Sequence, residues 1–342
     1  MKTSMGLRNS CAAVSERFAI TRLLETAPRR NSLIVLNYHR LGHGDRQPYD
    51  EGTFSATADE FADQVTFFKR KYSVVTLDEA IHLTTSKHLF RGTAILLTFD
   101  DGYLDNFEIA YPILQSLGVQ GTFFLISALV GSRDLPWWDR IAYAVKNATK
   151  PAIALNGPHQ MHFDLNAQDR ADVIRALLAQ YKKSVSHQSA SDFLTAVEEA
   201  CESRRPAADE RVFLDWNEAA DMISHGMAIG CHTHTHPVLS QLSVDDQYEE
   251  LKTVKETLQA RLSVPANVLA YPVGKKTTFT QETQQVLHQL GYRAAFSYYG
   301  GINLPGATMP FDIRRNSVDA GLPMSRLRMQ LALASVTGSY WF

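Results

Sequence analysis

The chain has 342 residues, of which 45% are hydrophobic and 20% are charged, and its formal net charge is −2. This composition is typical of a soluble globular protein with a large core, enough for one large α/β domain or two small ones. The charge balance gives no sign of binding to nucleic acid, so we expect no nucleic-acid partner.

Cysteine usage indicates the redox environment. Cys11, Cys201 and Cys231 are widely separated, and no CxxC pair occurs. This pattern argues against a disulfide framework and against a cysteine zinc site, and it fits a reducing compartment.

Residues 1–30 are predicted to form an N-terminal helical arm that precedes the main domain. Charged residues, notably Arg17, Arg22 and Glu25, interrupt the apolar positions of this arm. We expect neither a signal-peptide core nor a transmembrane segment here, and we therefore expect a cytoplasmic protein. A modest amphipathic helix in the arm could associate with a membrane surface, although packing onto the protein is the commoner use of such a helix.

Residues 31–342 are predicted to form a single α/β domain. Short apolar runs, typical of buried strands, alternate with segments of helical spacing. We expect strands at residues 32–38, 72–76, 94–98, 121–126, 227–231, 268–272, 292–297 and 312–318. We expect helices at residues 57–68, 76–80, 111–117, 216–223, 248–262 and 280–290. This alternation indicates a parallel βα architecture, in which functional groups lie at the carboxyl ends of the strands.

Residues 133–215 differ from the rest of the domain. They show helical periodicity but no catalytic cluster, so we expect a mostly helical insertion. We expect this insertion to contribute no metal ligand, although it contains His159, His162 and His187.

Two adjacent carboxylates, Asp100 and Asp101, follow the apolar run at residues 94–98. Neighbouring side chains at the end of a strand diverge unless the chain is already turning, and Gly102 permits such a turn. One carboxylate could then hold a metal ion while the other faces the water that the metal binds. A simple surface turn is the alternative interpretation.

A histidine cluster, HTHTH at residues 232–236, directly follows the strand expected at residues 227–231. The spacing of His232 and His236 places both imidazoles on one side of a helical turn, within reach of one metal ion. Together with Asp101 they would form a catalytic site for zinc or another divalent metal, with an open position for water. We expect His234 to point away.

Three motifs, TFDDG at residues 98–102, HTHTH at 232–236 and AYPVG at 270–274, resemble the leading motifs of the polysaccharide deacetylase family. These are NodB-homology enzymes, similar to carbohydrate esterase family 4. The likeness extends to residues 37–42 and 60–68, and it covers roughly residues 32–320 apart from the insertion. The resemblance implies a distorted (β/α) barrel that removes N-acetyl groups from amino sugars with a divalent metal, usually zinc.

The resemblance also implies roles for individual residues. Asp101, His232 and His236 would hold the metal, and Asp100 would act as general base, consistent with the chemistry of metal-assisted hydrolysis. A backbone N–H near Pro272 and Val273 would complete the oxyanion site on the substrate side.

Two departures from the family pattern concern the remaining catalytic groups. Many members carry an arginine in the third motif that orients the base, whereas this chain has Ala270 there, and Arg315 could substitute. The late Leu-x-His motif that supplies the general acid elsewhere is missing, because no histidine follows residue 300. His39, at the end of the first strand, is the candidate acid, and a hydrogen bond that steadies its loop is an equally good explanation of this residue.

The leading hypothesis is a metal-dependent deacetylase that hydrolyses the N-acetyl group of an N-acetylhexosamine in a polysaccharide or glycan precursor. Its partner would be an N-acetylated carbohydrate, on which Trp138 could stack, although buried anchoring is the commoner use of tryptophan. The alternatives are a carbohydrate-binding scaffold that has lost catalysis and a metal amidohydrolase that acts on a small amide.

Overall fold

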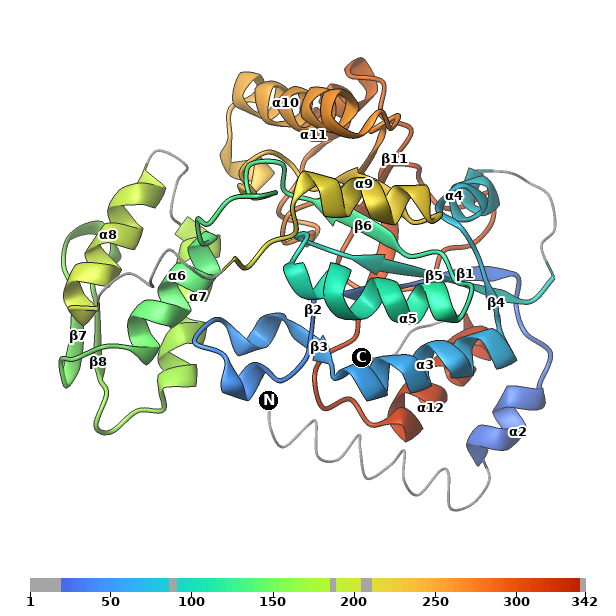
Figure 1. The fold of residues 1–342 in the computed structure, drawn as a ribbon, viewed down its shortest axis with the longest axis horizontal. Helices are drawn as coiled ribbons and strands as arrows, with labels where there is room; N and C mark the ends of the chain where they lie inside the picture. Colours follow the sequence, from blue (N-terminus) through green and yellow to red (C-terminus); the bar gives the residue numbers. More distant parts are fainter. Residues whose placement is uncertain (1–19, 86–90, 185–188, 204–210, 339–342) are drawn as a thin grey trace.

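The computed structural model describes residues 20–85, 91–184, 189–203 and 211–338. A closed parallel barrel forms the centre of the molecule (Figure 1). Its strands, in spatial order, are β1 (Ser32–Tyr38), β12 (Ile313–Ser317), β11 (Ala294–Ser297), β10 (Val268–Ala270), β9 (Ala228–Cys231), β6 (Thr122–Leu125) and β5 (Thr93–Phe99). The barrel closes because β1 pairs with both β12 and β5. The predicted distorted (β/α) barrel is therefore confirmed.

Helices surround the barrel. They are α3 (Ala58–Lys71), α4 (Leu77–Thr85), α5 (Tyr111–Ser116), α9 (Trp216–Ser224), α10 (Val244–Leu262), α11 (Gln281–Gln289) and α12 (Met324–Thr337), with a π-helical turn at Asn106–Ala110 before α5. The strand β4 (Ser73–Val74) adds to β5 outside the closed ring. Two further short strands, β2 (Arg40–Leu41) and β3 (Phe54–Ala56), pair with each other beside the barrel. Short 3-10 turns occupy Gly44–Arg46, Glu51–Thr53, Gly157–His159 and Leu239–Gln241.

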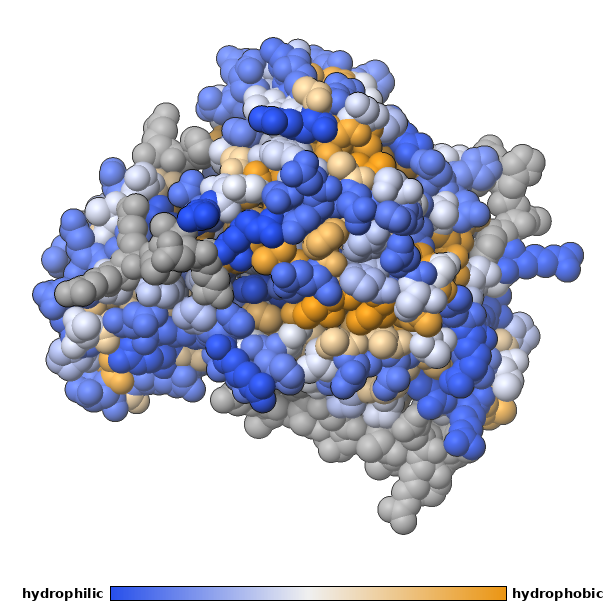
Figure 2. All heavy atoms as spheres, in the orientation of Figure 1, coloured by the Kyte–Doolittle hydropathy of each residue, from blue (hydrophilic) through white to orange (hydrophobic). Residues whose placement is uncertain are grey.

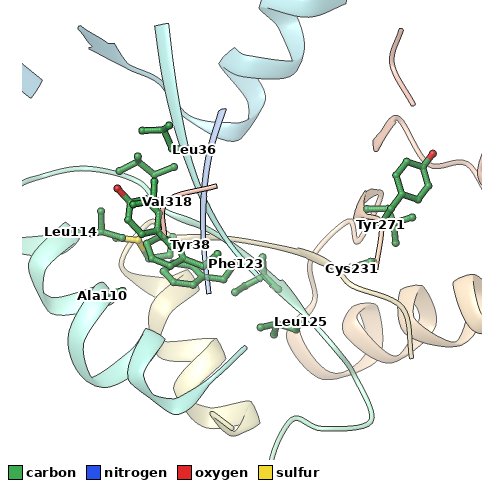
Figure 3. Packing of buried hydrophobic residues seen from close by; sticks show 14 of the residues in the cluster. Leu36, Tyr38, Ala110, Leu114, Phe123, Leu125, Cys231, Tyr271 and Val318 are labelled. Carbon is green, nitrogen blue, oxygen red and sulfur yellow. The ribbon is translucent and has the colours of Figure 1, made fainter. Parts of the chain in front are cut away.

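Alternate residues of each barrel strand enter different parts of the core. In β1, Leu36 and Tyr38 belong to the apolar layer under the helices, whereas Leu33 and Val35 belong to a second cluster with residues such as Phe124. Figure 3 shows side chains of the first layer gathered between the strands and the neighbouring helices. Burial on both faces explains why these strands read as continuous apolar runs.

Residues 20–30 of the N-terminal arm are described, and they contain the helix α2 (Ile20–Thr26), which lies against α12. Glu25 of α2 forms salt bridges with Arg328 at 2.9 Å and with Lys71 at 3.4 Å, so this part of the arm is tied to the protein. The helix α12 was not predicted, and it buries Leu327 and Leu331. None of the described helices combines the length and the apolar character that crossing a membrane requires.

The insertion forms a lobe beside the barrel, at the left in Figure 1. It contains α6 (Trp137–Lys146), α7 (Arg170–Ser184) and α8 (Ala190–Cys201), and its apolar side chains form a hydrophobic cluster that also includes Tyr49, Tyr103 and Ile126. An antiparallel hairpin of β7 (Ala152–Leu155) and β8 (Met161–Asp164) was not predicted. Strands of four residues are too short for hydrophobic periodicity to distinguish them from loops.

The face of the molecule in Figure 2 is mostly hydrophilic, and a strip of hydrophobic residues follows α5 and α3. Partly buried side chains such as Phe107, Ile113 and Leu117 pack against the main core in this region. The strip is therefore the outer edge of the core layer beneath these helices.

Candidate active site

A cavity of about 630 Å³ opens at the carboxyl ends of the barrel strands. The segments that follow different strands each contribute to its lining. These lining residues include His39, Asp100, Asp101, His232, His236, Val273, Tyr298, Arg315 and Ser317. The cavity has the position predicted from the parallel βα pattern, because parallel strands end on the same side of a barrel.

The turn after β5 begins at the second aspartate itself. Asp101 has a φ of 74° and Gly102 a φ of 81°, both in the left-handed region. A Cβ on Gly102 would lie 2.8 Å from the Leu125 Cδ2 atom, so the backbone must approach β6 more closely than another residue allows. This turn directs the two adjacent carboxylates into one cavity.

Asp101, His232 and His236 come together in the lining of the cavity. The Oδ1 atom of Asp101 lies 3.4 Å from His232 Nε2 and 3.7 Å from His236 Nε2. All three side chains are buried, and one ligand atom from each lies within 4.8 Å of the others. The structure thus brings together the three residues predicted as metal ligands.

The premise of a helical turn at the histidine cluster is wrong. Residues 232–236 form an irregular loop in which Thr233 and His236 have φ values of 62° and 61°. Thr233 Oγ1 accepts a hydrogen bond from the His236 backbone N–H at 3.0 Å. A carboxylate from α10, Glu250, accepts hydrogen bonds from the backbone N–H groups of His234 and Thr235. The two imidazoles therefore meet through a hydrogen-bonded loop.

Hydrogen bonding determines which ring nitrogen of His232 faces the cluster. His232 Nδ1 lies 2.8 Å from the carbonyl oxygen of Ala270, which can only accept, so Nδ1 carries the proton and Nε2 is free. His234, in contrast, contacts Ser127 through Nδ1 at 2.9 Å and does not line the cavity. This placement agrees with the expectation that His234 points away.

The electrostatics of the two histidines differ. Burial, together with the proximity of His232, lowers the pKa of His236 to about 3, so its imidazole is neutral near neutral pH. Burial alone would lower the pKa of His232, but the carboxylates of Asp100 and Asp101 raise it. Neutral imidazole is the form that binds metals, so metal binding competes with a proton on His232.

Asp100 is held on both carboxylate oxygens. Arg315 Nη1 donates to Oδ1 at 2.6 Å, and Asn37 Nδ2 donates to Oδ2 at 3.0 Å. Burial alone would raise the pKa of Asp100, but the charge of Arg315, followed by those of His232 and His39, lowers it well below its usual range. Asp100 is therefore an oriented anion beside the three-residue cluster.

Metal binding can be tested against the donor atoms. Asp101 Oδ1 is buried without a hydrogen-bond partner among the described residues. A buried carboxylate oxygen of this kind is costly unless a cation or donor satisfies it. One carboxylate and two neutral imidazole nitrogens are a common donor set for zinc and related divalent metals. The residues present therefore fit a divalent metal.

His39 and Arg315 reach the site from opposite ends of the chain. His39 Nε2 lies 3.8 Å from Asp100 Oδ2, and its ring contacts Tyr298 edge-on at 5.6 Å. Arg315 is fully buried and also donates to Asn37 Oδ1 at 2.7 Å. Because β1 lies between β5 and β12, both residues can approach Asp100.

A sequence model described as "Polysaccharide deacetylase" matches residues 89–295, which is more than half of the chain. The chain belongs to the polysaccharide deacetylase family. The relative YxkH from Bacillus subtilis (strain 168), named as a polysaccharide deacetylase, is 21% identical over 261 residues. That alignment covers 76% of this chain and 62% of the relative, so this chain spans less than two thirds of the relative's length.

Solved structures show the same fold. Streptococcus pyogenes deacetylase PplD, determined in complex with acetate, has a TM-score of 0.57 and 18% identity, covering 88% of this chain and 97% of that chain. IcaB from Ammonifex degensii has a TM-score of 0.57 and 19% identity, covering 90% and 98%. A de-N-acetylase from Aggregatibacter actinomycetemcomitans has a TM-score of 0.54 and 16% identity, covering 87% and 98%.

The family match includes both aspartates and both histidines of the site but neither His39 nor Arg315. Only the barrel closure places these two residues beside Asp100. Asn37 was not predicted as a site residue, and its position near the carboxyl end of the buried strand β1, two residues before His39, was the available signal. Tyr298 was also missed, because it follows β11 without any distinctive motif.

The residues predicted to contact substrate are placed differently from one another. Val273 lines the cavity and has a φ of 61°, whereas Pro272 is buried beside it and is not part of the lining. Trp138 lines the cavity but is only 5% exposed, with most of its ring inside the core of the insertion. Lys182 of α7 was not predicted, and it also lines the cavity, with Nζ 5.5 Å from the centre of the Trp137 ring.

Proposed function

We propose that this member of the polysaccharide deacetylase family is a metal-dependent deacetylase that hydrolyses the N-acetyl group of an N-acetylhexosamine in a polysaccharide or glycan precursor. The observation that carries the proposal is an anionic Asp100, oriented by Arg315, beside the cluster of Asp101, His232 and His236. A carbohydrate-binding protein has no use for such an oriented base, so this arrangement favours an enzyme over a binding scaffold.

Asp101, His232 and His236 would hold a divalent metal, with zinc as the first candidate. Such a metal, when bound, supplies Lewis acidity that polarises the acetyl carbonyl and makes water a better nucleophile. Asp100 takes the proton of the attacking water, and Arg315 keeps the carboxylate ionised and pointed at the site. Asn37 fixes the other carboxylate oxygen, so the base cannot rotate away.

Departure of the amine requires a proton, and His39 is the proposed donor. His39 lines the same cavity. Its Nε2 atom lies nearest to Oδ2 of Asp100, whereas Arg315 donates to Oδ1 of the same carboxylate. The backbone N–H of Val273, with Pro272 fixing the preceding turn, is the proposed donor to the developing oxyanion. Trp138 is proposed to present the exposed edge of its ring to the sugar.

The names of structural neighbours support acetamide chemistry, since one is a de-N-acetylase and another was solved with acetate. The proposed partner is an N-acetylated carbohydrate, without nucleic acid. A cytoplasmic location is part of the same proposal and rests on the sequence alone, and cell fractionation followed by immunodetection would test it.

The deciding experiment combines metal analysis with acetate release from N-acetylated oligosaccharides. Asp100→Asn should keep about one metal per chain and lose activity by roughly 10²- to 10⁴-fold, because only the proton acceptor is removed. Asp101→Asn should lose the metal as well, because it removes the only carboxylate of the ligand set.

Three outcomes would contradict the proposal. Full activity of Asp100→Asn would exclude its role as base, and loss of metal in that variant would exchange the roles of the two aspartates. Binding of the oligosaccharides by the metal-loaded wild type, without any release of acetate, would favour the catalytically altered scaffold instead.

A further inference from the structure

The two histidines of the proposed metal site are supported in different ways. His232 donates through Nδ1 to the Ala270 carbonyl oxygen at 2.8 Å. His236 Nδ1, in contrast, is buried and has no hydrogen-bond partner among the described residues. Histidine ligands are usually oriented by a hydrogen bond from the second ring nitrogen. The orientation of the His236 ring must therefore depend on packing.

An indole from the insertion supplies that packing. The Trp138 ring meets the His236 ring edge-on, with 4.6 Å between their centres and an interplanar angle of 62°. The neighbouring Trp137 ring is farther away, at 6.4 Å. Because Trp138 lies on α6 and His236 follows β9, this contact joins the insertion to the barrel site.

The Trp138 indole is itself fixed by hydrogen bonds. Its Nε1–H donates to the Tyr103 hydroxyl at 2.6 Å, and that hydroxyl donates to Asp139 Oδ2 at 3.2 Å. Asp139 Oδ1 accepts from the backbone N–H of Asp50 at 3.0 Å. Tyr103 and Asp139 are fully buried, so water does not compete for these bonds.

Two further groups contact the Tyr103 ring. Phe213 stacks on it with 4.9 Å between ring centres, and the Arg40 guanidinium lies 4.6 Å from the ring centre. Arg40 in turn donates through Nε to Asp105 at 2.9 Å. The hydroxyl that receives the Trp138 N–H therefore has a defined position.

We propose that Trp138, Tyr103 and Asp139 form a support that positions His236 for metal binding, so that the insertion helps to build the metal site although none of its described residues belongs to the ligand cluster. His187, one of the three histidines of the insertion, lies outside the described residues. This inference rests on the metal site of the proposed function. Trp138, Tyr103 and Asp139 are positioning residues, because each acts on the site through the next.

The test is Zn²⁺ affinity of the full chain, measured by competition with a chromophoric chelator after metal removal. Trp138→Phe and Tyr103→Phe should each weaken Zn²⁺ binding about 10-fold, the lower end of the range for residues that orient metal ligands. Trp137→Phe is the matched control. It removes a similarly buried indole of the same helix, whose Nε1 has no partner among the described residues, and it should change the affinity less than twofold.

A thermodynamic cycle separates this support from general loss of stability. Because Trp138→Phe and Tyr103→Phe break the same hydrogen bond, the double variant should bind Zn²⁺ about as weakly as either single variant. The visible spectrum of the Co²⁺-loaded protein reports ligand geometry, and it should change in both variants but not in Trp137→Phe. Tyr103→Phe keeps the aromatic ring that stacks on Phe213. It therefore tests the inference by itself if Trp138→Phe does not fold.

Wild-type affinity and an unchanged Co²⁺ spectrum in folded Tyr103→Phe would overturn the inference, as would an equal loss in Trp137→Phe. Those results would leave the proposed function intact, because Asp101→Asn would still abolish metal binding. A wild-type chain that binds no Zn²⁺ would overturn the proposed metal site and this inference together.

Discussion

The two adjacent aspartates have contrasting surroundings. Arg315 and Asn37 satisfy both oxygens of Asp100, whereas Asp101 Oδ1 faces only the imidazoles of His232 and His236. A carboxylate that accepts two strong hydrogen bonds is a stable anion, and one that lacks donors is open to a cation. The contrast explains why the same residue type can act as base at one position and as metal ligand at the next.

A prediction at the same scale concerns His39. His39→Ala should lower the turnover number by roughly 10²- to 10⁴-fold while leaving the metal content intact, because it removes the proposed proton donor but no ligand. Steady-state kinetics of acetate release would measure the turnover number, and metal analysis would measure the metal content. His288→Ala, which alters an exposed histidine on α11, should match the wild type.

A turnover number of His39→Ala close to that of the wild type would instead assign both proton transfers to Asp100. In that case His39 would only steady the loop after β1, where its backbone already bonds to Ser55 and Asn106.

Among the elements, α6 joins two environments. Its first turn carries Trp137 and Trp138, which line the cavity, and Asp139, which lies in the core beside Tyr103 and Asp50. A helix that buries a carboxyl group needs donors for it, and the loop before β3 supplies one through the backbone of Asp50. The insertion is therefore bound to the barrel through polar contacts as well as apolar packing.

The Asp139 carboxyl makes a testable contribution to the pH dependence of stability. Burial raises the pKa of Asp139 to about 7, against the opposing charge of Arg40 and the hydrogen bond from Asp50. The unfolded chain releases this proton near pH 4, so the folded state loses stability as the pH rises from about 4 to about 7. Asp139→Asn imitates the protonated acid and does not titrate.

Urea unfolding of metal-free protein at pH 5 and pH 8 would measure this effect. As the pH rises from 5 to 8, the free energy of unfolding of the wild type should fall relative to that of Asp139→Asn, by on the order of a few kcal/mol. For Asp172→Asn, at an exposed position of α7, the difference from the wild type in the free energy of unfolding should be the same at both pH values. The same difference between wild type and Asp139→Asn at both pH values would show that Asp139 is already ionised throughout.

For the whole molecule, the barrel is what brings distant parts of the chain into one site. The proposed metal ligands come from the ends of β5 and β9, and Arg315 comes from β12. Such a ligand set exists only in the folded chain, so a bound metal stabilises the fold by mass action.

Removal of metal should therefore lower the midpoint of thermal unfolding. At a free Zn²⁺ concentration about 100 times the dissociation constant, the stabilisation is roughly 2.7 kcal/mol. Calorimetry with added Zn²⁺ and with excess chelator would measure the difference as a shift of a few degrees. Asp101→Asn should unfold at the same temperature under both conditions, and a shift in that variant as large as the wild type's would place the metal elsewhere.

Hydrophobic patterning and motif spacing were enough to predict the class of fold and to identify the main candidate residues of the site. Continuous apolar runs such as residues 32–38 and 94–98 predicted the buried strands, because burial on both faces removes the polar alternation. The aspartate pair and the histidine pair were recognisable because each directly follows such a strand. Local patterns could not show the hairpin of the insertion or α12, since neither has a strong period.

The remaining contacts of the candidate site depend on how distant parts of the chain fold together. Arg315, Asn37 and His39 meet Asp100 because β1 pairs with both β5 and β12, a contact between residues nearly 280 positions apart. The loop at residues 232–236 turns through left-handed residues and a contact with α10, not through a helix. Trp138 reaches His236 because the insertion folds back on the barrel. Sequence patterns report the local environment of a residue, whereas these partners depend on the closure of the whole barrel.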